Sequence, residues 1–132
     1  MFPTRGWTGV MVVALACAAP FAAAGAAPRG EEIYARCLAC HALAYDRVGP
    51  RHCGLFGRRA GSVRGYDYSN AMRGSGIVWD AATLDRFLAA PTEVVPGTTM
   101  GYAGIPDAAE RTALIEWLRG ASRAAKSCPQ HP

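Results

Sequence analysis

The feature that most constrains this chain is the five-residue run Cys37-Leu38-Ala39-Cys40-His41, a C-x-x-C-H motif. Two thiols at this spacing can each form a thioether bond to a vinyl group of a porphyrin, and the histidine that follows can bind the iron as an axial ligand. The motif therefore predicts a covalently attached haem c, held through Cys37 and Cys40 and ligated by His41.

Two other chemistries use cysteines at this spacing. A thioredoxin-like redox pair requires a βαβ context, and no strand-rich stretch precedes Cys37. A zinc site requires four nitrogen or sulfur ligands at regular spacing. His52 and Cys53 are available, but their separation from the motif matches no common zinc pattern. Both alternatives are less favoured than haem.

The N-terminus has the pattern of a secretory signal peptide. Arg5 supplies a positive charge, residues 9–19 are apolar, and residues 22–27 are small. This order of charge, apolar stretch and small-residue cleavage site is typical of export signals. We expect residues 1–26 to be removed and residues 27–132 to form one domain.

Export implies a periplasmic location, with an anchored form as the less favoured alternative. Residues 9–27 are nearly long enough to span a bilayer uncleaved. A lipid-modified Cys17 is disfavoured because residues 14–16 match a lipoprotein signal poorly.

Size and charge narrow the range of functions. A domain as small as residues 27–132 buries a modest core by itself, so a large apolar cofactor suits its length. The formal net charge of +4 comes almost entirely from arginine, since Lys126 is the single lysine. A mild basic excess favours docking to acidic protein surfaces. Basic residues do not alternate with aromatic ones, so we expect no nucleic-acid partner.

Two further cysteines follow the motif in the expected domain. If haem takes Cys37 and Cys40, then Cys53 and Cys128 are left. Export would permit a disulfide between them. Free thiols are equally compatible with the sequence.

Short helices separated by long loops are predicted. The helices are expected over residues 30–36, 80–88 and 107–120, and the segments 42–54 and 92–105 are expected to be loops. Asp80 and Asp107 fit N-caps, as does Ser69 before a short helix. Pro91 should stop the second helix and Gly120 should end the third.

The expected loop over residues 92–105 contains Met100 among glycine and proline residues. Loop methionines usually serve packing. After a C-x-x-C-H motif, however, a soft thioether is a natural sixth ligand, and it raises the reduction potential of the iron. His41 and Met100 are therefore the predicted metal ligands. Should Met100 not bind, another residue such as His52 is a candidate.

Several motifs, taken together, resemble a class I (mitochondrial-type) cytochrome c, close to the bacterial periplasmic cytochromes of that group. The resemblance extends over residues 30–120. Its segments follow one another in the order of the family: 30–34, 37–41, 49–50, 54–58, 65–71, 76–79, 96–100, 103–105 and 114–118.

This resemblance implies an all-α cytochrome c fold, with short helices and long loops wrapped around one covalently attached haem c. It implies that Pro50 orients the imidazole of His41. It places Tyr102 beside the haem. Three residues would surround the propionates: Arg58, Tyr68 and Trp79.

The chain departs from the family at several positions. His52 replaces an apolar residue that usually packs against the haem, and Phe87 replaces a tyrosine near the methionine sulfur. Met72 stands where asparagine is common, and Thr99 stands where the docking rim carries a lysine. Residues 42–48 look shortened. These differences bear on the reduction potential and on the choice of partner.

The function expected from the resemblance is electron transfer between transient redox partners, without catalysis of bond chemistry. Such partners would be a quinol–cytochrome c reductase, a terminal oxidase, or a periplasmic dehydrogenase or reductase, with the chain itself a monomer. Two alternatives stay open. One is a haem peroxidase-like enzyme or a gas or redox sensor with a labile methionine ligand. The other is a membrane-anchored cytochrome subunit of an oxidase.

Overall fold

The computed structural model of the chain describes Met1, residues 29–124 and Cys128. Residues 2–26 of the expected signal peptide lie outside the described residues, so the predicted domain boundary stays a prediction. Among the residues that the structure describes, no helix is long and apolar enough to cross a membrane.

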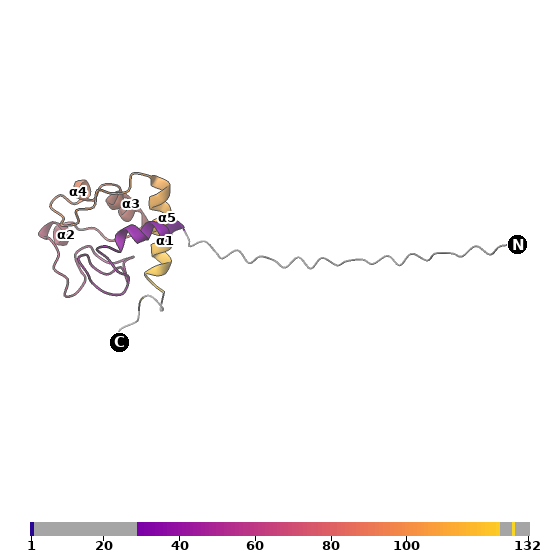
Figure 1. The fold of residues 1–132 in the computed structure, drawn as a ribbon. Helices are drawn as coiled ribbons and strands as arrows, with labels where there is room; N and C mark the ends of the chain where they lie inside the picture. The colour runs from indigo at the N-terminus through magenta and orange to yellow at the C-terminus, as the bar shows by residue number, and fades with distance from the viewer. Residues whose placement is uncertain (2–28, 125–127, 129–132) are drawn as a thin grey trace.

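The described residues form short α-helices joined by long loops, with no β-strand and one isolated bridge between Arg59 and Val78 (Figure 1). This confirms the expected all-α class. In chain order the elements are α1 (Arg29–Tyr34), a 3₁₀ helix η1 (Ala35–Cys37), α2 (Asn70–Gly74), α3 (Ala81–Ala89), α4 (Pro91–Val94) and α5 (Ala108–Ala121).

The first and last helices cross in direct contact, although they lie at opposite ends of the sequence (Figure 1). Gly30 of α1 makes this approach possible. A Cβ atom at Gly30 would lie 2.3 Å from the carbonyl oxygen of Ala113 and 2.4 Å from Cβ of Trp117 in α5. No side chain larger than hydrogen fits at this point of the crossing.

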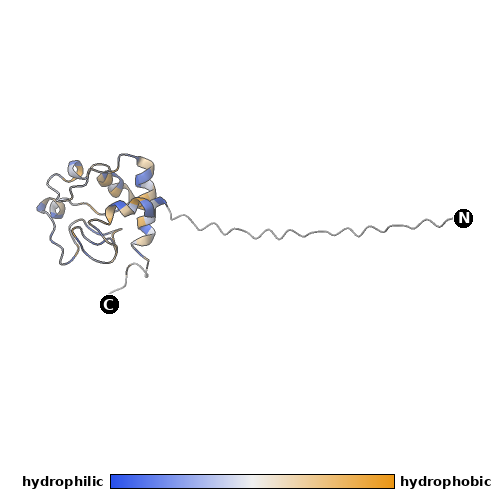
Figure 2. Cartoon of the chain, in the orientation of Figure 1, coloured by the Kyte–Doolittle hydropathy of each residue, from blue (hydrophilic) through white to orange (hydrophobic). Residues whose placement is uncertain are grey.

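The core lies between this helix pair and α3. Tyr34 is 3 % exposed and Leu114 is fully buried. Tyr34 packs on Trp117 of α5 with 4.7 Å between ring centroids. Farther along the chain, Trp79 packs on Phe87 of α3 at 5.1 Å. Figure 2 shows hydrophilic and hydrophobic stretches alternating along α5, as an amphipathic helix requires.

Side-chain caps begin the helices where the sequence predicts them. The Asp80 carboxylate accepts from the Thr83 amide at 2.7 Å, and the Thr83 hydroxyl accepts from the Asp80 amide at 2.8 Å. The Asp107 carboxylate accepts from the first amides of α5. Ser69 accepts from the Met72 amide and caps α2. These contacts satisfy amide donors that a helix start otherwise leaves unpaired.

The ends of two helices differ from expectation. α3 stops at Ala89 as predicted, but Pro91 begins the short helix α4 instead of an extended loop. Proline is well suited to a first helical position, because its missing amide would have no helical partner there. α5 continues one residue past Gly120 to Ala121. A glycine is tolerated inside a helix, although it weakens it.

Arg111 of α5 connects the last helix to α3 and to the segment before α5. Its Nε donates to the Asp85 carboxylate at 2.7 Å, and its Nη1 donates to the carbonyl oxygens of Ile105 and Pro106 at 2.8 and 2.9 Å. Arg111 therefore joins the segment that enters α5 to α3, the helix that carries Asp85.

Cys53 and Cys128 form a disulfide across a sequence separation of 75 residues. Beside it, the Gly54 amide donates to the Ser122 carbonyl at 3.0 Å. Of the two states that the sequence permitted, the structure has the disulfide. It joins the loop after the motif to the end of the chain.

The α1–α5 crossing gives a first prediction. Gly30→Ala should lower the free energy of unfolding by about 1–3 kcal/mol, because the new methyl group meets backbone and Cβ atoms that have no rotamer to escape into. Urea unfolding of the holoprotein measures this. Gly120→Ala is the matched control, since a Cβ atom there meets nothing within 4 Å. That variant should be neutral or slightly more stable. Equal losses of unfolding free energy in Gly30→Ala and Gly120→Ala would contradict the close packing of α1 on α5 at Gly30.

Candidate functional site

The motif residues lie on a tight turn directly after η1. The amides of Cys40 and His41 donate to the Cys37 carbonyl at 3.1 and 2.8 Å. The Cys37 thiol is half-buried and the Cys40 thiol is exposed, and neither is in a disulfide. Burial raises the pKa of the Cys37 thiol. The turn thus presents two reduced thiols and one imidazole from five consecutive residues.

The imidazole of His41 is held in one orientation by Pro50. Its Nδ1 lies 2.8 Å from the Pro50 carbonyl oxygen. A carbonyl can only accept, so Nδ1 carries the proton and Nε2 keeps its lone pair. His41 is 9 % exposed, and burial lowers its pKa. A neutral imidazole with a free Nε2 lone pair is the form that binds a metal ion.

Gly49 forms one wall of this imidazole's surroundings. A Cβ atom at Gly49 would lie 2.3 Å from Cε1 of His41 and 2.6 Å from both ring nitrogens. The Gly49 amide also donates to the Cys40 carbonyl at 2.7 Å. Gly49 belongs to one of the segments that resemble the family, and no role was predicted for it. Its role is to let the backbone pass against the His41 ring.

The three residues expected around the propionates come together. The Trp79 amide donates to the Arg58 carbonyl at 3.0 Å. Burial raises the pKa of Tyr68, and the nearby Arg58 guanidinium opposes that rise. Arg58 donates from Nη1 to the Cys53 carbonyl and from Nη2 to the Arg51 carbonyl, at 2.8 and 2.9 Å. Among the described residues, its buried Nε has no partner.

Met100 and Tyr102 lie on the segment between α4 and α5. Both are partly buried and pack against the hydrophobic core. The Met100 amide donates to the Thr98 hydroxyl at 3.2 Å. Tyr102 lies near Arg36, the residue before the motif. Glu110 raises the pKa of Arg36 by a hydrogen bond and by its charge, and Tyr102 adds a smaller contribution in the same direction. Binding of the iron by Met100 stays a prediction.

His52 makes a contact that was not predicted from the sequence. Its ring stacks on that of His41, with 4.4 Å between centroids and 20° between planes. Its Nδ1 lies 3.0 Å from the Tyr34 hydroxyl. Burial lowers the pKa of His52 to about 3, and positive charge on His41 and Arg58 acts in the same direction. His52 is therefore a neutral ring stacked on His41. Because it packs against the first proposed ligand, it is poorly placed to bind the iron in place of Met100.

The zinc interpretation of the motif is wrong for the described part of the chain. His52 is engaged by Tyr34, and Cys53 is in the disulfide. Across residues 29–124 and Cys128, no three histidine, cysteine or acidic side chains gather where they could hold a metal ion.

The residues present fit a haem c. Reduced thiols flank a turn that ends in a buried imidazole, and the lone pair of that imidazole is free. A buried guanidinium nitrogen of Arg58 still needs an acceptor, and a propionate carboxylate is one. Leu55, Met72 and Leu88 contribute apolar surface to the core cluster that Met100 and Tyr102 pack against.

The chain is similar to known c-type cytochromes. Cytochrome c2 of Rhodomicrobium vannielii is 41% identical over 108 residues, which cover 80% of this chain and 86% of the relative. Cytochrome c2 of Blastochloris viridis is 39% identical over 114 residues, 84% of this chain and 88% of the relative. The solved structure of cytochrome cH from Methylobacterium extorquens superposes with a TM-score of 0.68 at 41% identity, covering 72% of this chain and 98% of that one. No family model matches.

The contact between Gly49 and His41 gives a second prediction. Gly49→Ala should displace the His41 ring, because a methyl group cannot occupy a point 2.3 Å from Cε1. We expect the NMR signals of the His41 ring in the holoprotein to move, and the free energy of unfolding to fall by about 1–3 kcal/mol.

Gly74→Ala in α2 is the matched control, since its Cβ atom would meet nothing within 4 Å. Its His41 signals should stay in place. Unchanged His41 signals in Gly49→Ala would show that the close wall at Gly49 is not needed to position the ring.

Proposed function

This chain belongs to the family of class I c-type cytochromes, and from that membership we propose that it shuttles electrons between respiratory redox proteins in the periplasm, with His41 and Met100 as the axial ligands of its haem. As a member of the family it is an electron-transfer protein with one covalently bound haem c. When bound, the haem supplies a one-electron couple between ferric and ferrous iron.

The observation that carries the proposal is the hydrogen bond from His41 to Pro50. Because Nδ1–H is committed to the Pro50 carbonyl at 2.8 Å, the ring cannot flip without losing that bond. Nε2 is thereby kept unprotonated and directed away from Pro50. Pro50 thus acts as the orienting partner, and a bond of this kind also increases the basicity of the ligand. Cys37 and Cys40, on the same turn, are the proposed attachment points.

Met100 is the proposed second ligand because its loop is held at both ends. Val95 at the end of α4 and Ile105 before α5 are 3 % and 2 % exposed. The Ile105 amide donates to the Leu88 carbonyl at 2.8 Å, and its carbonyl accepts from Arg111. A short loop between two buried anchors limits the positions that the Met100 thioether can take. If His41 and Met100 both bind the iron, no position would be open for substrate, so we propose no enzyme activity.

Arg58, Tyr68 and Trp79 are proposed to surround the propionates, and Tyr102 to lie beside the haem. The Nε of Arg58, which has no hydrogen-bond partner among the residues that the structure describes, supports the first assignment. A guanidinium already fixed by the carbonyls of Arg51 and Cys53 can neutralise a buried carboxylate without first being ordered.

Partners are proposed to dock near the motif. Leu38, Tyr45 and Val48 are exposed, with Tyr45 at 61 % and Val48 at 76 %. Arg47 donates to the Leu38 carbonyl and so lies among them. Small, partly apolar interfaces of this kind suit brief encounters with a quinol–cytochrome c reductase, a terminal oxidase, or a periplasmic dehydrogenase or reductase.

Export to the periplasm is supported by the disulfide between Cys53 and Cys128, because such bonds persist in oxidising compartments. The mass of the mature protein tests cleavage near residue 26. Release of a shortened chain agrees with a free carrier. A full-length chain that stays with the membrane would favour the anchored-subunit alternative.

Ligation gives the third prediction. Met100→Leu should abolish the weak long-wavelength absorption band that a methionine sulfur gives when bound to ferric haem, because leucine has no atom that binds iron. It should also lower the reduction potential. Absorption spectra of the oxidised holoprotein measure the band. Met72→Leu is the matched control, since Met72 is buried in α2 and the exchange nearly conserves volume. It should keep the band.

Absence of the band in the unmodified protein would contradict His41/Met100 ligation. Rapid binding of cyanide or carbon monoxide would then favour the enzyme or sensor alternative. Slow or negligible binding by the unmodified protein, made fast by Met100→Leu, is the result expected of a carrier.

A further inference from the structure

We propose that Tyr34 and His52 act as a pair of positioning residues that fix the plane of the His41 imidazole and thereby set the reduction potential. The inference rests on the proposed role of His41 as an axial ligand. It concerns two residues outside the ligand set, one in α1 and one in the loop after the motif.

The two imidazoles are stacked. Their centroids are 4.4 Å apart and their planes differ by 20°. A ring in this position covers one face of His41. Rotation of His41 about its Cβ–Cγ bond would drive the ring edge into His52. The hydrogen bond to Pro50 fixes one point of the ring, and the stack fixes its plane.

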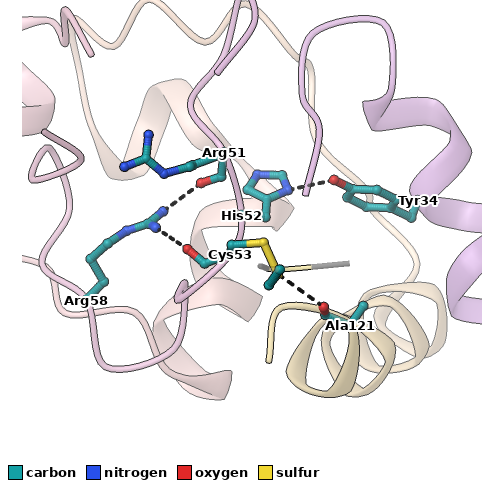
Figure 3. Close-up of a disulfide and its surroundings, with 7 residues drawn as sticks. Tyr34, Arg51, His52, Cys53, Arg58 and Ala121 are labelled. Carbon is teal, nitrogen blue, oxygen red and sulfur yellow. Dashed lines mark hydrogen bonds between the residues drawn. A yellow bond between two sulfur atoms is a disulfide. The ribbon is translucent and has the colours of Figure 1, made fainter. Parts of the chain in front are cut away.

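The plane of His52 is itself determined by Tyr34. The Tyr34 hydroxyl and His52 Nδ1 are 3.0 Å apart and point toward one another (Figure 3). A hydrogen bond is directional, whereas an apolar side chain at position 52 would fill the space without fixing an orientation. The pair therefore supplies an angular constraint that packing alone does not.

Tyr34 is well placed to be the fixed end of this pair. It is 3 % exposed, lies at the end of α1, and packs on Trp117 of α5 at 4.7 Å. Its ring is thus held by the crossing of the first and last helices. Through its hydroxyl, Tyr34 ties the orientation of His52 to the packed crossing of α1 and α5.

The backbone of His52 is also held from several sides. Its amide lies 3.1 Å from the carbonyl oxygens of both Ala42 and Leu43. Arg58 donates to the carbonyls immediately before and after it, those of Arg51 and Cys53 (Figure 3). The next residue, Cys53, is tied to Cys128. The His52 side chain is therefore attached to a backbone whose position is fixed by several contacts.

The test uses the purified holoprotein with His52→Leu, Tyr34→Phe and the double variant. Thr112→Val is the matched control, because it also removes a hydroxyl hydrogen bond, the one from Thr112 to the Ala108 carbonyl on the exposed side of α5. The first readout is the pattern of paramagnetically shifted haem methyl NMR signals of the oxidised protein, which depends on the plane of the axial imidazole. The second is the reduction potential.

We expect Tyr34→Phe and His52→Leu each to redistribute the methyl signals. Each should also change the equilibrium constant for reduction by at least about two-fold, which is ~18 mV for one electron at 59 mV per tenfold. Because Tyr34 acts through His52, the double variant should match His52→Leu instead of adding the two changes. Thr112→Val should leave both readouts unchanged.

Methyl signals and potentials like those of the unmodified protein in Tyr34→Phe and His52→Leu would overturn the inference, even if both variants unfold more easily. That result would assign the pair to packing alone. Failure of the proposed function appears elsewhere, as the missing methionine band of the unmodified protein. If only the present inference fails, the methionine absorption band is present in the unmodified protein and in every variant.

Discussion

The close crossing of α1 and α5 is the contact on which the rest of this structure depends. Because Gly30 has no side chain, the first helix can lie against the backbone of the last. The 3₁₀ helix and the C-x-x-C-H turn follow α1 without a break, so the position of the motif is set by this crossing. The same contact orders Tyr34 against Trp117. A helix of six residues would be marginal alone in water, and its packing against α5 is what stabilises it.

The surroundings of His41 show how a chain without a large core can still fix the position of an imidazole. Three constraints act on one ring: a hydrogen bond to Pro50, a backbone wall at Gly49, and the stacked ring of His52. All three come from the loop after the motif. That loop carries little regular structure, and its rigidity comes from the hydrogen bonds of Arg58 and from the disulfide of Cys53.

The side-chain caps at the starts of helices were the features most readily predicted from the sequence. Asp80 and Asp107 cap α3 and α5, because a carboxylate at this position accepts amides only two or three residues away. The stop before Pro91 follows from the missing amide of proline. Whether a helix resumes after it is decided by packing, and α4 was therefore missed. Met100 was predicted as a ligand because a thioether in a glycine- and proline-rich loop follows a C-x-x-C-H motif, and residues 96–100 match the family; periodicity gave no signal there, because the loop has no regular pattern.

The sequence by itself determined the cofactor and its covalent attachment, because two thioether bonds need only two cysteines at this spacing in one short turn. It also determined the family, through motifs spread over residues 30–120. The tertiary structure decided which side chains meet across long separations. Cys53 and Cys128 pair, and Tyr34 reaches His52, because the helix crossing brings both ends of the chain to the loop after the motif. Such contacts leave no periodic trace in a sequence, since their spacing is set by the fold and not by the geometry of any single element.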